Sequence, residues 1–168
     1  IMDFFTLPKI ELHLHLDCSI SLEAVRQIDP AISPAAYRER FVAPAKCLNL
    51  ADYLTRAVAA IELLQTQSAL RIITLDLFRQ LAADGVIYAE IRFAPLEHLH
   101  KGLTAPAVVQ TVLEAMEQGR EQTGIEAGLI LCTLRHYTEA KSLELAQLAV
   151  QFKGAGVAGM DIASDEGN

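Results

Sequence analysis

Apolar and polar residues alternate along residues 10–17, a pattern that predicts a β-strand. The aliphatic parity is Ile10, Leu12, Leu14 and Leu16, and the ionisable parity is Glu11, His13, His15 and Asp17. Successive side chains of a strand point to opposite faces, so one face should be aliphatic and the other ionisable. Two histidines at this spacing lie about 7 Å apart at their Cα atoms, which lets both imidazoles reach one metal ion. The alternative is a half-exposed strand with its polar face in water.

The rest of the chain predicts three more strands, over residues 86–95, 128–136 and 157–163, where β-branched residues gather between glycines and prolines. Helical periodicity predicts helices between these strands, with Ser33, Asn49, Ser68, Thr104 and Thr138 as capping residues at their starts. The expected helical ranges are 22–28, 35–41, 50–64, 68–84, 105–121 and 139–153. A strand followed by a helix, four times over, predicts parallel strands joined by crossover helices.

Each of these strands carries polar residues on one parity, whereas parallel strands covered on both faces are normally hydrophobic throughout. The polar parity contains Tyr88, Glu90 and Arg92 in the second strand, Thr133 and Arg135 in the third, and Asp161 in the fourth. A closed (β/α)8 TIM-type barrel can bury such a stripe, because one face of every strand looks at a shared interior. Arg92, Arg135 and Asp161 would then support the site at its mouth. The alternative is that they form only a buried ion network.

Four strand–helix units are half of an eight-unit barrel, which typically needs about 250 residues. We therefore expect residues 1–168 to form the N-terminal half of a single α/β barrel domain. Such a half has two open sheet edges, so it should need the remaining half or another copy to cover them.

Composition narrows the possible partners and compartments. The net charge of −7 argues against a nucleic-acid partner, and no run of 18 apolar residues is present to span a membrane. The three cysteines are odd in number and form no CxxC pair, which indicates a reducing compartment and hence a cytoplasmic protein.

Five segments of the chain resemble the adenosine deaminase family of zinc hydrolases. They are LPKIELHLHLD at 7–17, LADYL at 50–54, DGVIYAEIRFAP at 84–95, LILCTLRH at 129–136 and MDIASDE at 160–166. The motifs follow one another in the family's order over nearly the whole chain. The HxHxD motif alone is only moderately specific, but the set with these spacings is highly specific.

The resemblance implies a (β/α)8 barrel with one Zn²⁺ at its mouth. It assigns His13 and His15 as zinc ligands and Asp17 as the acid that binds the ribose side of a nucleoside. Leu50 and Tyr53 would belong to an apolar lid over the purine, although their pattern would serve equally well for ordinary helix packing. In the family, zinc lowers the pKa of a bound water, which then attacks C6 of the purine.

Two residues depart from the family pattern. Cys18 stands where the family has a glycine after the aspartate, and Ser164 stands where it has a glycine whose backbone N–H faces the purine. A glycine permits close approach and positive φ, which other residues do not readily allow. The third zinc histidine, the catalytic glutamate and the last zinc aspartate of the family lie on later strands. We therefore expect this segment alone to be inactive.

The leading hypothesis is a full-length protein that converts adenosine to inosine and ammonia. The alternatives are an adenine or other aminopurine deaminase of the same family, a metal-dependent phosphoesterase or nuclease, and a non-catalytic half-barrel module. Asp17 favours a nucleoside, since adenine deaminases resemble this motif with a glutamate in its place. A phosphoesterase should carry basic residues near the mouth, whereas this chain is acidic.

Overall fold

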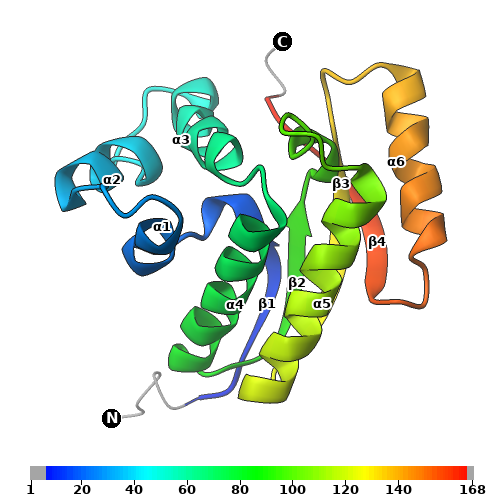
Figure 1. Cartoon of the computed structure of the whole chain (residues 1–168), viewed down its shortest axis with the longest axis horizontal. Coiled ribbons are helices and arrows are strands. Elements are labelled where there is room, and N and C mark those ends of the chain that lie inside the picture. The colour runs from blue at the N-terminus through cyan, green and yellow to red at the C-terminus, as the bar shows by residue number, and fades with distance from the viewer. Residues whose placement is uncertain (1–6, 166–168) are drawn as a thin grey trace.

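Four parallel strands form the centre of the protein, in the order β1-β2-β3-β4 (Figure 1). The computed structural model describes residues 7–165. The strands are β1 (Lys9–His15), β2 (Val86–Phe93), β3 (Glu126–Leu134) and β4 (Val157–Ala163). The predicted α/β class with parallel strands is therefore confirmed, and β1 and β4 are the two edges of the sheet.

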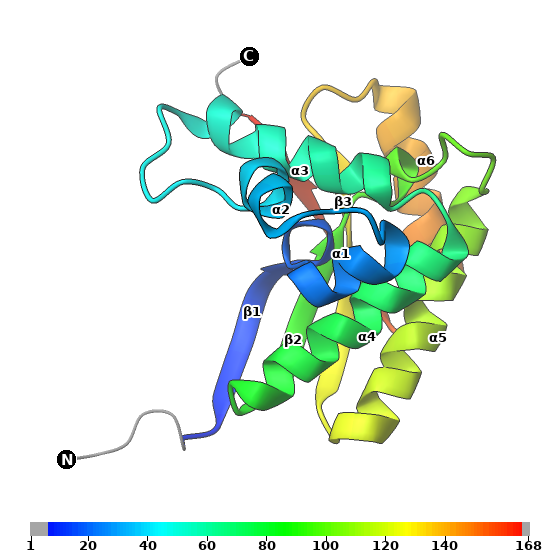
Figure 2. The same ribbon diagram turned by 60° about the vertical axis from the view of Figure 1, so that its left-hand side comes forward.

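Helices connect the strands and cover one face of the sheet. Four of them lie between β1 and β2: α1 (Leu22–Ile28), α2 (Pro34–Phe41), α3 (Leu50–Leu63) and α4 (Gln67–Ala83). Two more follow β2 and β3: α5 (Ala105–Thr123) and α6 (Glu139–Gln151). Helices α4, α5 and α6 pack on the sheet, whereas α3 lies across the end where the strands finish (Figure 2). Short 3-10 turns follow β1 at Leu16–Cys18 and β2 at Pro95–Glu97.

Side-chain caps explain where the helices begin. The capping side chains each accept a hydrogen bond from the backbone N–H three residues later, and they are Ser21, Ser33, Asn49, Thr66, Thr104 and Thr138. The prediction that α4 begins at Ser68 was wrong, because Thr66 takes the capping role and the helix starts at Gln67. None of the helices within residues 7–165 is both long and apolar enough to cross a bilayer.

The hydrophobic core lies between the sheet and the helices that cover it. The sheet contributes Ala89, Ile91, Phe93, Leu129 and Leu131, and the helices contribute Ile73, Leu77, Val108, Val112 and Leu145. Helices α4 and α5 also pack closely on each other, since a Cβ at Gly119 would lie 2.5 Å from Phe78 Cγ. Truncating one of the buried leucines to alanine should cost about 2–5 kcal/mol of unfolding free energy.

The two faces of β3 differ from the expectation. Thr133 Oγ1 lies 2.8 Å from Ser142 Oγ of α6, so Thr133 faces the helices. The opposite parity, Cys132 and Leu134, lines the inner cavity described below. The prediction that Thr133 faces the interior was wrong, because a hydroxyl on the helical side can be satisfied by a neighbouring helix.

Arg135 follows the last residue of β3, and its backbone N–H donates to Ala163 O at 3.0 Å. Its side chain is exposed and does not line the cavity. Arg135 is thus not among the described residues that line the cavity holding the histidines.

The edge strands leave apolar side chains in the open. Ile10 and Leu12 of β1 are 63% and 54% exposed, and Met160 and Ile162 of β4 are 44% and 49% exposed. In β1 the aliphatic parity therefore reaches the core only from Leu14 onward. Apolar surface is therefore open to solvent at both edges of the sheet.

Candidate active site

A cavity of about 650 Å³ lies at the carboxyl ends of the strands. Its walls combine the end of β1, the turn after it, one side of α3, the segments after β2 and β3, and the end of β4. The residues that line it include His13, His15, Asp17, Leu50, Tyr53, Glu97, Cys132, His136, Asp161 and Ser164. The carboxyl end of parallel strands is where barrels of this type carry their active sites.

His13 and His15 bring their rings together at the cavity wall. The ring centres are 5.4 Å apart and the planes are tilted by 49°. Burial, with help from His13 and Arg92, lowers the pKa of His15, which keeps that imidazole neutral. Neutral imidazole is the form that binds a metal ion.

The two histidines fit two positions of a zinc site. Two imidazoles bound through nitrogen at about 2.0–2.1 Å with a tetrahedral angle have centres about 5 Å apart, close to the separation seen here. Within residues 7–165, no three His, Cys, Asp or Glu side chains lie together as a metal-binding group. A catalytic zinc site normally has three protein ligands or more, so the two histidines alone are fewer than such a site needs.

Asp17 is placed by the short 3-10 turn that ends β1. The turn carries Leu16 into the core and buries the Asp17 carboxyl at the cavity wall. Burial raises the pKa of Asp17 to about 6, and the nearby Glu97 carboxylate acts in the same direction. Its Oδ1 lies 3.9 Å from His15 Nδ1. A carboxyl group buried at the wall of a cavity, beside His15, is placed to accept a hydrogen bond from a polar ligand.

Glu97 is a cavity residue that the sequence did not single out. It ends the 3-10 turn after β2, where it accepts hydrogen bonds from the Tyr137 hydroxyl and, at 3.2 Å, from Lys141 Nζ. Lys141 Nζ also lies 3.7 Å from the centre of the Tyr137 ring. Although burial opposes its ionisation, these two donors lower the pKa of Glu97. The clue in the sequence was its place directly after a strand, at the edge where the site forms.

Arg92 ties three strands together beneath the histidines. Its guanidinium pairs with Asp161 of β4 and donates at 3.0 Å to the carbonyl oxygen of Leu12 in β1. The arginine is buried, and Asp161 lines the cavity. Of the three predicted supporting residues, Arg92 and Asp161 are thus together and next to the site. Because the Asp161 side chain is 34% exposed, solvent screens this pair, and breaking it should cost less than the roughly 3–5 kcal/mol typical of a fully buried ion pair.

Helix α3 supplies the apolar wall of the cavity. Six of its residues line this space: Leu50, Tyr53, Leu54, Ala57, Val58 and Ile61. Leu50 and Tyr53 are 45% and 43% exposed, and Val58 is 55% exposed. Apolar side chains left open over a cavity can cover the flat face of a ring-shaped ligand.

Ser164 follows β4 directly and lines the opposite side of the cavity. Its φ is +92°, the one positive value of a non-glycine residue within residues 7–165. Cys18, the other departure noted in the sequence, follows Asp17 and also lines the cavity.

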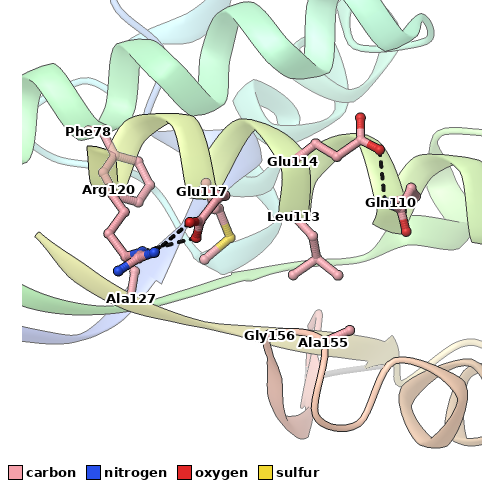
Figure 3. Close-up of a pocket in the computed structure, with 10 residues that line it drawn as sticks. Phe78, Gln110, Leu113, Glu114, Glu117, Arg120, Ala127, Ala155 and Gly156 are labelled. Carbon is pink, nitrogen blue, oxygen red and sulfur yellow. Dashed lines mark hydrogen bonds and ion pairs between the residues drawn. The ribbon is translucent and has the colours of Figure 1, made fainter. Parts of the chain in front are cut away.

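A second hollow, of about 290 Å³, lies on the helical side near the amino ends of β3 and β4 (Figure 3). It is lined mainly by α5 and by the turn at Ala155 and Gly156. Its charged groups are paired with each other, since Arg120 Nε donates to Glu117 at 2.9 Å. We therefore locate the candidate active site in the larger cavity.

Comparison with known proteins agrees with this arrangement. The family model described as adenosine deaminase matches residues 8–168. The chain belongs to the adenosine deaminase family. Adenosine deaminases from Enterococcus faecalis and Clostridium kluyveri are 42% and 36% identical to it, each over 95% of this chain. The matches cover 49% and 48% of those two proteins, so the chain spans about half the length of its curated relatives.

Solved structures related to the adenosine deaminase family share the fold. An adenine deaminase from Arthrobacter aurescens is 26% identical, with a TM-score of 0.79 over 95% of this chain and 49% of its own. An amidohydrolase from Burkholderia ambifaria with bound zinc is 21% identical, with a TM-score of 0.82 over 98% of this chain and 46% of its own. These neighbours are TIM-barrel enzymes, which confirms the predicted fold class.

Proposed function

We propose that the full-length protein is a zinc-dependent hydrolase that deaminates adenosine to inosine and ammonia, with residues 1–168 as the N-terminal half of its barrel. The observation that carries this proposal is the pair of histidine rings, 5.4 Å apart, beside a cavity with one apolar wall. Membership of the adenosine deaminase family supports the same chemistry.

His13 and His15 would hold the zinc ion, whose role when bound is to lower the pKa of water and so make it a nucleophile at neutral pH. Burial keeps His15 neutral and ready to bind. Arg92 holds the Leu12 carbonyl, directly before His13, and so fixes the backbone from which the histidines project. The rigid strand end lets both rings keep a binding geometry before the metal arrives.

Asp17 and helix α3 would place the substrate. Asp17 is buried at the cavity wall, where a ribose hydroxyl can donate to its carboxyl group. Leu50, Tyr53 and their neighbours on α3 would cover the purine ring and exclude water from the reacting carbon. Glu97 stays ionised and paired with Tyr137 and Lys141, so it serves to fix the cavity rim.

The charges around the cavity favour a nucleoside over a nucleotide. No lysine or arginine is among the described residues that line the cavity, whereas Asp17 and Glu97 both line it. A phosphate group is normally bound by arginine, lysine or backbone N–H groups, and two carboxyl groups would repel it. An N6-methyl-AMP deaminase from Arabidopsis, 22% identical, shares the fold with a TM-score of 0.79. We expect this protein to differ from that enzyme in rejecting the phosphate.

The remaining half of the barrel would cover the open edges of the sheet. Ile10 and Leu12 on β1, and Met160 and Ile162 on β4, expose apolar surface at the two edges. Exposed edge strands also carry unpaired backbone groups that other chains can join. We propose that the rest of the full-length polypeptide pairs with both edges and supplies the missing zinc ligands, and that residues 1–168 alone associate with another copy.

Turnover by the purified full-length protein tests the function. Adenosine, adenine and adenosine 5′-monophosphate are each supplied to the zinc-loaded protein, and ultraviolet absorbance and released ammonia are followed. We expect adenosine to give the highest kcat/KM and the monophosphate the lowest. A preference for adenine would favour the adenine deaminase alternative, and no turnover of any of the three would contradict the proposal.

A further inference from the structure

Helix α3, which forms the apolar wall of the cavity, is most deeply buried at its carboxyl end. Ala60 and Leu64 near that end are buried, whereas Tyr53 and Val58 are 43% and 55% exposed. The helix lies across the ends of the strands and packs chiefly on α2 and on the short turn after β1 (Figure 2). Contacts at its carboxyl end therefore bear directly on where its apolar side chains stand over the cavity.

Gln65 lies just beyond this helix, and every polar group of its amide has a partner. Its Nε2 donates to the carbonyl oxygens of Ile61 and Glu97, at 2.7 and 2.8 Å. Its Oε1 accepts a hydrogen bond from the backbone N–H of His100 at 2.9 Å. The residue is only 2% exposed. Because the last carbonyl groups of a helix lack partners within it, a side chain such as this one satisfies them.

His98 makes a second bond between the same two segments. Its Nδ1 donates to the carbonyl oxygen of Leu64 at 2.9 Å, and the histidine is 1% exposed. The centre of its ring lies 5.6 Å from that of Phe93, the last residue of β2. The end of α3 is thus tied to the segment after β2 by bonds that water does not reach.

The segment after β2 is itself held at the rim of the cavity. The Glu97 carboxylate accepts hydrogen bonds from Tyr137 and Lys141, which both follow β3. Gln65 bonds the backbone carbonyl of the same glutamate. Through Gln65 and Glu97, the wall formed by α3 is therefore connected to the ends of both β2 and β3.

We propose that Gln65 is a positioning residue for the substrate, whose amide holds the α3 wall at the distance from the strand ends that a bound purine ring requires. This assignment rests on the proposed function, because it takes a purine nucleoside as the ligand. Gln65 is not among the described residues that line the cavity, so it acts through α3. A wall that contacts the ligand equally before and during the reaction contributes to KM rather than to kcat.

Steady-state kinetics and hydrogen exchange of the zinc-loaded full-length protein test the assignment. Gln65→Met keeps the length of the side chain and removes all three hydrogen bonds. Gln65→Asn keeps an amide that is one methylene shorter, so it cannot bond both segments at once. Gln67→Met makes the matched change at an exposed position, at the start of α4 and outside the cavity.

We expect Gln65→Met to raise KM for adenosine about three- to tenfold and to leave kcat within about twofold of the wild-type value. Without ligand, the backbone amides of α3 should exchange faster in this variant than in wild type, whereas those of β2 and β3 should keep their rates. Gln65→Asn should change both quantities in the same direction by less. Gln67→Met should match wild type in both.

Three results would overturn the assignment. A fall in kcat with KM unchanged would show a purely structural role, because loss of folded protein lowers the active fraction and not the affinity. Unchanged exchange in α3 would show that other contacts hold the helix. Faster exchange with an unchanged KM would show that the position of the wall does not affect binding.

Two further outcomes are distinguished by the same measurements. If Gln65→Met does not fold, the readings are taken on Gln65→Asn, and a wild-type KM in that variant counts against the proposal. If wild type itself does not turn over adenosine, the proposed function falls and the assignment to substrate falls with it. The exchange rates of α3 would then still report whether Gln65 holds the helix.

Discussion

The candidate active-site cavity and the smaller hollow on the helical side differ in how their polar groups are satisfied. In the smaller one, on the helical side, Arg120 is paired with Glu117, and Gln110 with Glu114 (Figure 3). Arg120 Nη1 also donates to Glu126, at 3.4 Å. In the larger one, the His13 ring and the Ser164 hydroxyl have no hydrogen-bond partner within residues 7–165. Polar groups without a protein partner at the wall of a cavity mark a binding site better than the presence of a hollow does.

Replacing either histidine at the larger cavity should cause the largest loss of activity. In the full-length protein, His13→Ala or His15→Ala should lower kcat for adenosine at least about a thousandfold and remove zinc, because each takes away one ligand. The measurements are turnover and metal content of the purified protein.

His100→Ala is the control for this change, since His100 is exposed and does not line the cavity. It should keep both zinc and activity. Full activity in His13→Ala with one zinc per chain would contradict the placing of the candidate active site in the larger cavity.

Replacing Asp17 should cause the next largest loss of activity. Asp17→Asn should lower kcat/KM for adenosine about tenfold to a hundredfold, the value of one hydrogen bond to a carboxylate, and should affect adenine less. Steady-state kinetics on both substrates provides the check. Asp84→Asn, an exposed aspartate at the other end of the sheet, should leave both rates unchanged. Equal losses on adenosine and adenine would argue against a contact to ribose.

A buried histidine outside both hollows should control stability in acid. His98 donates from Nδ1 to Leu64 O at 2.9 Å, and burial lowers the pKa of His98 to about 4. The unfolded chain takes up this proton near pH 6.5, so the stability due to neutral His98 is complete above that pH and is lost as pH falls toward 4.

Between pH 7 and pH 5 this loss should amount to about 2 kcal/mol. His98→Gln keeps a donor for Leu64 O but cannot titrate, so its unfolding free energy should fall less over the same interval. Denaturant unfolding of both proteins at the two pH values measures the difference. Identical losses would mean that His98 takes up no proton on unfolding.

A substitution at the smaller hollow should cause the smallest change in activity and stability. Arg120→Ala removes an exposed side chain that bonds only to neighbouring carboxylates. It should leave kcat/KM within about twofold of the wild-type value and the thermal midpoint within about 2 °C of it, because exposed ion pairs contribute little to stability. Thermal unfolding and turnover under identical buffer conditions are the readouts. A large loss of activity would mean that this hollow also takes part in function.

The sequence predicted the elements well because their signals are local. Strand β4 and helix α1 begin and end where periodicity and capping place them, and Ser33, Asn49 and Thr138 cap as expected. Thr66 was missed because two capping residues lie two positions apart, and only packing selects between them.

The candidate site was predicted where the chain carries a motif and missed where it depends on long-range packing. His13, His15, Asp17 and Ser164 line one cavity, as their motifs suggested, although their roles stay predictions. Glu97 was missed because its partners Tyr137 and Lys141 lie 40 and 44 residues away. The direction of Thr133 depends on Ser142 of α6, which alternation within one strand cannot reveal.

The order of the strands bears on how the protein folds as it is made. Each strand pairs with the next one along the chain, from β1 to β4. Lys9 of β1 pairs with Val86 of β2 across four intervening helices, so β1 waits for β2 to emerge, but it waits for no strand beyond β4 to make that pairing. Domains generally fold from the amino-terminal end during synthesis. The two histidines and the arginine beneath them should therefore be assembled on the ribosome, ready for zinc, before any later half of the barrel has emerged.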